Sequence, residues 1–151
     1  MSAVMPEIPD RRQYNHHLVT ELQEERQQVW ALYCKVADQK PFISSSEVQT
    51  TLNQFSQILV DYVSLGHFGI YERLLNGTER RDAVLTAAKD IYPEFEKTTE
   101  SVVSFNDKYD SQKQTFSTNE LEVDLSTLGE DLAKRIDLED KLCMLVLGKT
   151  E

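Results

Sequence analysis

The residues that could take part in chemistry are concentrated in one apolar stretch, residues 59–75. Among its aliphatic and aromatic side chains this stretch carries Asp61, His67, Glu72 and Arg73. A histidine beside a carboxylate can work as an acid–base pair, so His67 with Asp61 or Glu72 is the catalytic arrangement to consider. No nucleophile elbow, glycine-rich phosphate loop or HExxH pattern accompanies it. We therefore predict that the chain is not an enzyme.

Metal-binding and redox patterns are also missing from the sequence. His16 and His17 are adjacent and lack the i, i+4 companion that a helical metal site needs. Cys34 and Cys143 stand too far apart to form a metal motif, and both have apolar neighbours. We expect both cysteines to be buried free thiols. The sequence thus predicts no metal and no cofactor.

A second polar feature interrupts the apolar pattern near the C-terminus. The stripe of the last helix, continued with helical period, places Glu139 at an inward position, one turn after Arg135. A charge near a helical core is costly unless it is paired and hydrogen-bonded. Two interpretations follow: a buried salt bridge to Arg73 or Arg135, or a cavity that opens to a partner.

The length and the net charge of the chain limit its expected number of domains and its expected kind of partner. The chain has 151 residues and a formal net charge of −10. Such a length favours one domain, which we expect to span residues 1–151, with flexible ends at 1–9 and 148–151. Phosphate contacts need clustered Lys and Arg, and no basic run is longer than Arg80–Arg81. We therefore expect no direct nucleic-acid binding and favour a basic protein partner.

Membrane insertion and secretion are not indicated. The longest unbroken apolar run, Leu142 to Leu147, has six residues, whereas a membrane span needs about 18 or more. The first ten residues contain no basic patch followed by an apolar stretch. We predict no membrane association and a cytoplasmic location.

The apolar periodicity predicts helices throughout. Apolar residues three, four or seven apart predict a first helix from about Asp10, its N-cap, to Ala37. A second stripe follows the loop around Pro41, and Gly66 and Gly69 loosen the pattern after it. We expect Pro93 to end a third segment and to start a fourth. Together these patterns predict an all-α, antiparallel, four-helix-bundle-like fold with short broken helices in the middle.

Some apolar residues fall off the main stripes, and they leave two interpretations open. They either pack a helix on two sides or form an exposed apolar groove with acidic rims. The residues in question are Val19, Trp30, Leu32, Ile58, Val60, Ile70 and Leu145.

Two segments resemble a known family. Residues 59–73, LVDYVSLGHFGIYER, closely resemble the signature of the regulator-of-sigma-D family, which includes the alginate regulator AlgQ. Residues 138–147, LEDKLCMLVL, resemble the last helix of the same family. The loop around Pro41 and the Tyr92–Pro93 pair also fit, so the resemblance covers about residues 10–147.

The resemblance implies an anti-sigma factor. Members of this family are helical bundles that bind the C-terminal, fourth domain of the housekeeping sigma factor. They thereby block its contacts with the −35 promoter element and with core RNA polymerase, typically in stationary phase. For this chain the resemblance implies a 1:1 complex with that domain. Weak self-association is a further prediction, and a small-ligand or catalytic cavity on Asp61, His67 and Glu139 is the alternative function.

The family motif also suggests which residues bind the partner. By position we predict that the partner-binding residues are Arg26, Asp61, His67, Phe68, Tyr71, Glu72, Arg73 and Glu139. One departure lies in the first helix, where relatives often show Asp-Arg-Trp-Leu and this chain has Thr20, Glu21, Leu22 and Gln23. If the first helix contributes to the interface, its contacts in this chain differ from those of its relatives.

Overall fold

Long helices account for most of the chain. The structure is a computed structural model that describes residues 7–42, 46–76, 82–109 and 118–148, and it has no β-strand within those ranges. The helices are α1 (Glu7–Ala37), α2 (Ser46–Ser64), the π-helical segment η1 (Leu65–Tyr71), α3 (Glu72–Asn76), α4 (Asp82–Lys108) and α5 (Thr118–Val146). The predicted all-α class is confirmed.

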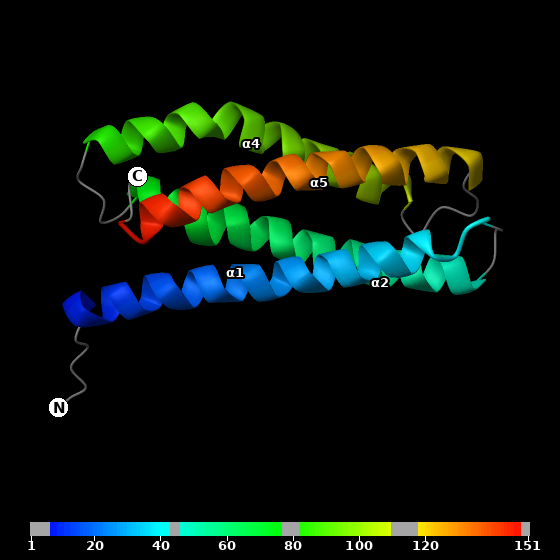
Figure 1. The fold of residues 1–151 in the computed structure, drawn as a ribbon, viewed down its shortest axis with the longest axis horizontal. Helices are drawn as coiled ribbons and strands as arrows, with labels where there is room; N and C mark the ends of the chain where they lie inside the picture. The colour runs from blue at the N-terminus through cyan, green and yellow to red at the C-terminus, as the bar shows by residue number, and fades with distance from the viewer. Residues whose placement is uncertain (1–6, 43–45, 77–81, 110–117, 149–151) are drawn as a thin grey trace.

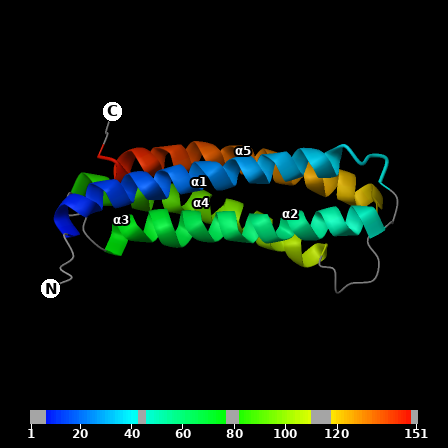
Figure 2. The same ribbon diagram turned by 90° about the horizontal axis from the view of Figure 1, so that it is seen from below.

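The helices lie alongside one another as an antiparallel bundle (Figure 1). α1 and α4 run in one direction, α2 and α5 run in the other, and the start of α1 lies at the same end as the end of α5. α2, η1 and α3 follow one another as a single rod, which is easiest to see from below (Figure 2). We call this unit, residues 46–76, the α2–α3 rod. It contacts α1 along α2, contacts α4, and meets α5 through η1 and α3.

The predicted apolar stripes form the core. Every stripe residue of α2 is at most 4% exposed, namely Val48, Leu52, Phe55, Leu59 and Tyr62. The stripes of α4 and α5 supply Phe95, Val102, Phe105, Leu121, Leu125, Leu128 and Leu132. Each such side chain stabilises the fold by about 1.5–3 kcal/mol through removal from water. The helical period of the sequence thus determines which faces turn inward.

Two predicted helix boundaries were wrong. α1 begins at Glu7, so Asp10 lies inside the helix and is not its N-cap. Pro9 is compatible with this because it stands in the first turn, where a backbone N–H has no helical acceptor. α4 continues through Pro93 without ending. Pro93 is exposed, so water can reach the backbone carbonyl that loses its helical donor, and packing on both sides of the proline holds the helix together.

The exposed side chains correct one further expectation. Cys34 is exposed and only Cys143 is buried, because position 34 faces away from the buried stripe of α1. Phe68, one of the predicted partner-binding residues, is 64% exposed. Among the off-stripe apolar residues, Val60 is half exposed, whereas the others are buried or packed against the core. Within the described ranges, no helix is long and apolar enough to cross a membrane.

Candidate functional site

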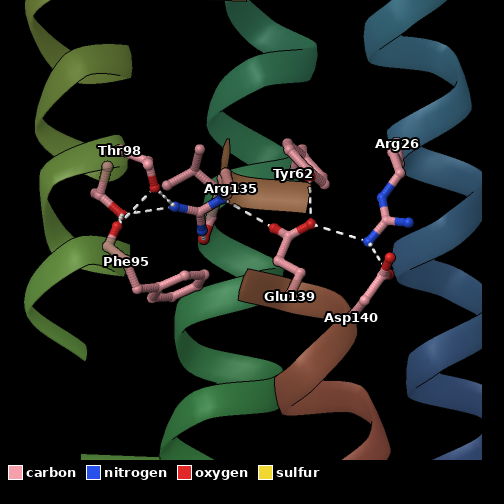
Figure 3. A network of polar contacts seen from close by, with 9 residues as sticks. Arg26, Tyr62, Phe95, Thr98, Arg135, Glu139 and Asp140 are labelled. Carbon is pink, nitrogen blue, oxygen red and sulfur yellow. Dashed lines mark hydrogen bonds and ion pairs between the residues drawn. The ribbon is translucent and has the colours of Figure 1, made fainter. Parts of the chain in front are cut away.

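A network of polar side chains crosses the middle of the bundle (Figure 3). Its centre is Arg135 of α5, which is fully buried. Arg135 Nε donates to Glu139 Oε2 at 2.9 Å. Its Nη1 donates to the hydroxyls of Thr98 and Thr99 of α4 at 3.0 and 2.8 Å. The guanidinium carbon also lies 4.1 Å from the centre of the Phe95 ring, a cation–π contact.

Glu139 receives donors from three directions and is 1% exposed. Besides Arg135, the hydroxyl of Tyr62 donates to Oε1 in a short hydrogen bond. Arg26 Nη2 of α1 donates to the same oxygen at 3.2 Å and also pairs with Asp140 at 3.1 Å. Arg26 therefore connects the buried carboxylate with Asp140 at the surface. Of the two interpretations of Glu139, the buried salt bridge to Arg135 is confirmed.

Burial and the contacts within the network shift the pKa values of Glu139 and Tyr62. Burial raises the pKa of the Glu139 carboxyl, while Arg135, the Tyr62 hydroxyl and Arg26 act to lower it again. Burial, together with the neighbouring Glu139 charge, raises the pKa of the Tyr62 hydroxyl. Tyr62 is thus held as a proton donor to Glu139. This arrangement suits a structural connection between helices, since the charged head groups have partners inside the bundle.

Six members of the network were not among the predicted site residues, although Arg135 was considered as an ion-pair partner of Glu139: Tyr62, Phe95, Thr98, Thr99, Arg135 and Asp140. Thr98 is 4% exposed and occupies an inward position between Phe95 and Val102. A polar residue at an inward position was the signal that identified Glu139, and the same signal would have found Thr98. Tyr62 and Phe95 gave no such signal because aromatic residues are ordinary core residues.

A second cluster surrounds η1 and reaches Tyr92 of α4. His67 lies edge-on to the Phe68 ring at 4.8 Å, and its Nε2 is 3.6 Å from Glu72 Oε2. Tyr71 is buried and stacks on Tyr92 of α4 with ring centres 4.7 Å apart. His67, Phe68, Tyr71 and Glu72 therefore form one cluster. We call it the η1 cluster.

Asp61 lies apart from both sets of residues. It is exposed and lines a groove of about 610 Å³ between α2 and α4. The groove is otherwise lined by Asn53, Ser56, Gln57, Val60, Asn106, Asp107 and Tyr109. Asn106 Nδ2 donates to the Ser56 carbonyl at 3.3 Å, but its buried Oδ1 accepts no hydrogen bond from the described residues. The groove thus combines exposed carboxylates with amide groups.

The predicted site residues consequently fall into three places. Arg26 and Glu139 belong to the buried network, the residues around His67 form the η1 cluster, and Asp61 lines the groove. Among the described residues, no hydrogen bond or ion pair joins Asp61 or His67 to Glu139. The side chain of Arg73 lies outside the described part of the structure. The described residues also contain no group of three or more His, Cys, Asp or Glu that could hold a metal ion.

The structure is thus an all-α bundle with a buried ionic network. Polar and aromatic residues lie along the surface of the α2–α3 rod. Residues 1–147 match the family described as the regulator of RNA polymerase sigma(70) subunit, Rsd/AlgQ. The chain is 43% identical over 103 residues to the "Regulator of sigma D" of Escherichia coli O1:K1 / APEC. It is 42% identical over 103 residues to the protein of that name from Shigella dysenteriae serotype 1.

The chain belongs to the Rsd/AlgQ family of sigma(70) regulators. Each of the two matches covers 66% of this chain and 63% of the relative, so the matched region spans less than two thirds of the length of those proteins. No solved structure matches the chain significantly.

Proposed function

We propose that this chain is an anti-sigma factor that binds the C-terminal, fourth domain of the housekeeping sigma factor in a 1:1 complex. Binding covers the basic surface that recognises the −35 promoter element and contacts core RNA polymerase. Core polymerase is then left to alternative sigma factors, as in stationary phase. The chain acts by occupying its partner in the cytoplasm, with no chemical step, no cofactor and no contact with nucleic acid.

The observation that carries this proposal is the placement of Asp61. It lies in a groove whose opposite wall carries a second exposed carboxylate, Asp107. On its other side, the charges of Glu21 and Asp61 both help to raise the pKa of Glu25, after the larger effect of burial. Carboxylates crowded in this way are relieved by a cation. An arginine or lysine of a basic DNA-reading module would supply it, which favours such a partner.

The η1 cluster supplies an apolar contact on the same rod. Phe68 is a large, exposed aromatic side chain held against His67. Aromatic residues are enriched among the few positions that contribute most of the binding energy of an interface. We assign Asp61 and Phe68 to direct contact with the sigma domain, with His67, Tyr71, Glu72 and Arg73 beside them. Arg26 and Glu139 contribute from inside the bundle.

The alternative function, a small-ligand or catalytic cavity, gains no specific support. It requires Asp61, His67 and Glu139 to converge, and the three side chains lie in different parts of the structure. His67 pairs with Glu72 instead. We therefore propose the sigma-binding function alone.

A titration of the full chain with the isolated sigma C-terminal domain tests the proposal. We expect saturable 1:1 binding by calorimetry at moderate salt, with an affinity that weakens as salt rises because exposed charges are screened. Absence of binding at both low and moderate salt would reject the function. Light scattering of the free chain in the same experiment tests weak self-association.

A matched pair of variants tests the site. Asp61→Ala should weaken binding by about 1–3 kcal/mol, the range for loss of a charge-assisted contact. Asp137→Ala, which removes another exposed carboxylate, on α5, should bind like the wild type. Equal loss in both variants would mean that net charge and not the groove drives association.

A further inference from the structure

The buried network touches the α2–α3 rod at the point where its helical geometry changes. Arg135 Nη2 donates to the backbone carbonyl of Val63 at 3.3 Å. Two residues later the chain enters η1, where the hydrogen bonds span five residues, as in the bond from the Glu72 N–H to the His67 carbonyl. π-helical turns are rare and are frequently found at functional sites. Arg135 therefore binds the backbone at the junction of α2 with η1.

Gly66 allows the backbone of η1 to lie close to the Arg135–Glu139 pair. A Cβ atom at Gly66 would lie 3.0 Å from Arg135 Nη2, 3.1 Å from Glu139 Oε2 and 3.6 Å from the Phe95 ring. The head groups of the ion pair thus occupy the space that any side chain at position 66 would need. The backbone of η1 rests directly on the Arg135–Glu139 pair.

The pair itself cannot easily move. Arg135 is fixed by Glu139 on its own helix, by Thr98 and Thr99 on α4, and by the face of the Phe95 ring. The planar guanidinium donates along several fixed directions at once, which an ammonium group cannot reproduce. A rigid support of this kind determines where the segment lying on it is held.

We propose that Arg135 and Glu139 are positioning residues for sigma binding. They hold η1 in its π-helical geometry and thereby place Phe68 and His67 for contact with the partner. Neither residue touches the partner. This inference rests on the proposed function. It also gives a reason why a charged pair lies in the core.

The link from the pair to the surface runs through η1 itself. Gly66 lies on the pair, and the next two residues along the same segment are His67 and Phe68. The His67 ring lies within 6.1 Å of the ring centres of Phe68, Tyr71 and Tyr92. Any displacement of η1 therefore changes the aromatic surroundings of His67, which makes this histidine an internal reporter.

The test uses Arg135→Lys, which keeps the charge and loses the fork of donors. In the wild type, ring currents should displace the His67 Hε1 signal in the proton NMR spectrum from those of the exposed His16 and His17. In the variant we expect this signal to move toward them. We also expect the affinity for the sigma C-terminal domain to fall by about tenfold.

Two controls separate positioning from loss of stability. Leu121→Ala removes a buried side chain near the start of α5. The start of α5 lies at the opposite end of the bundle from α3, which directly follows η1 (Figure 2), so the variant lowers stability without touching η1. It should leave both the His67 signal and the affinity of the folded chain unchanged. Gly66→Ala should behave like Arg135→Lys.

Each outcome decides the question. A His67 signal that stays in place in Arg135→Lys overturns the inference, whether or not affinity falls. A displaced signal with wild-type affinity also overturns it. If the wild-type chain itself fails to bind, the proposed function is rejected, while the His67 signal still reports whether the pair holds η1. A displaced signal together with a fall in affinity, absent in Leu121→Ala, supports the inference.

Discussion

Arg135 Nε donates to Glu139 Oε2 at 2.9 Å across one turn of α5, and neither side chain is more than 1% exposed. The carboxylate accepts further hydrogen bonds from Tyr62 and Arg26. A buried ion pair gives little net stability, because the desolvation of two charges offsets their attraction. Removing only one partner is different, because it leaves the other charge buried without compensation.

Glu139→Ala should therefore be strongly destabilising. We expect the free energy of unfolding to fall by about 3–5 kcal/mol, since Arg135 keeps its charge and loses its counterion. Urea denaturation followed by circular dichroism measures this. The double variant Arg135→Met with Glu139→Leu removes both charges and should lose clearly less than the sum of the single variants. A loss below about 1 kcal/mol for Glu139→Ala would contradict a buried, coupled pair.

Replacing glycine by alanine normally stabilises a helix, but at Gly129 of α5 we expect it to destabilise the chain. Its Cβ would lie 2.3 Å from the Tyr33 hydroxyl oxygen and 2.9 Å from Tyr33 Cζ. That hydroxyl donates to the Leu125 carbonyl at 2.9 Å. Alanine is favoured over glycine in a helix by about 1 kcal/mol, whereas overpacking costs about 1–3 kcal/mol. We expect Gly129→Ala to lower the melting temperature.

The sign of this effect should reverse when Tyr33 is shortened. On a Tyr33→Leu background the hydroxyl and the ring are gone, so Gly129→Ala should no longer clash and should raise the melting temperature relative to Tyr33→Leu alone. The comparison is made by differential scanning calorimetry. An equal fall on both backgrounds would show that Tyr33 is not what fills the space above Gly129.

Asp124 should make the bundle sensitive to acid. Burial acts to raise its pKa, but bonds from Lys108 at 2.8 Å and from the Tyr109 hydroxyl at 2.6 Å hold the pKa below the ordinary value of 3.8. A lowered pKa means that the ionised form is favoured in the folded state. The resulting stability is present above pH 3.8 and is lost as pH falls through the lowered value.

Asp124→Asn tests this pH dependence. We expect the variant to be less stable than the wild type by about 1 kcal/mol at pH 7, a value reduced by the partial exposure of the side chain. The difference should shrink as pH falls below 4, which urea titrations at several pH values can follow. Asp137→Asn, at an exposed position, should match the wild type throughout. A difference that does not change with pH would refute the role of the Asp124 charge.

The sequence predicted inward positions more reliably than helix ends. Leu52, Phe55 and Leu59 recur with helical period, and burial follows from that period alone. Pro93 was misinterpreted because its local effect opposes a helix, while the packing that outweighs it involves residues far away in the sequence. The start of α1 was misplaced because a proline in the first turn, as at Pro9, does not prevent a helix from beginning before it.

The candidate site was predictable only in part. Glu139 could be identified because a charge stood at an inward position, and Arg135 because it lies one turn away. The π-helix could not be predicted, since Gly66 and Gly69 only loosen the pattern. Its geometry depends on Arg135, 69 positions after Gly66 in the sequence. The separation of Asp61 from Glu139 likewise depends on how the helices pack.

Glu25 should contribute to binding at the expense of stability. Its pKa is raised, first by burial and then by the charges of Glu21 and Asp61, and its Oε1 is buried without a described hydrogen-bond partner. The Glu25 carboxyl is therefore protonated more readily in the folded chain than in the unfolded chain. The contribution of Glu25 to stability consequently rises as pH falls through the raised pKa toward the ordinary value of 4.5.

Glu25→Gln should raise the melting temperature at pH 7 and reduce the gain in melting temperature that the wild type shows as pH falls toward 4.5. It should also weaken binding of a basic partner, because a nearby negative charge is lost. Glu24→Gln removes the adjacent exposed charge and should leave the melting temperature unchanged. A lower melting temperature for Glu25→Gln would mean that this carboxylate has a stabilising partner.

Phe68 should separate binding from folding most cleanly. Its side chain is 64% exposed, so Phe68→Ala should change the free energy of unfolding by less than about 0.5 kcal/mol. Because Phe68 is proposed as an aromatic anchor, its replacement by alanine should weaken binding to the sigma C-terminal domain by about 2 kcal/mol or more. Val123, also 64% exposed, provides a control on α5, and Val123→Ala should bind normally. If Phe68→Ala keeps wild-type affinity in calorimetry, η1 lies outside the interface and the contact surface must be sought along the groove around Asp61.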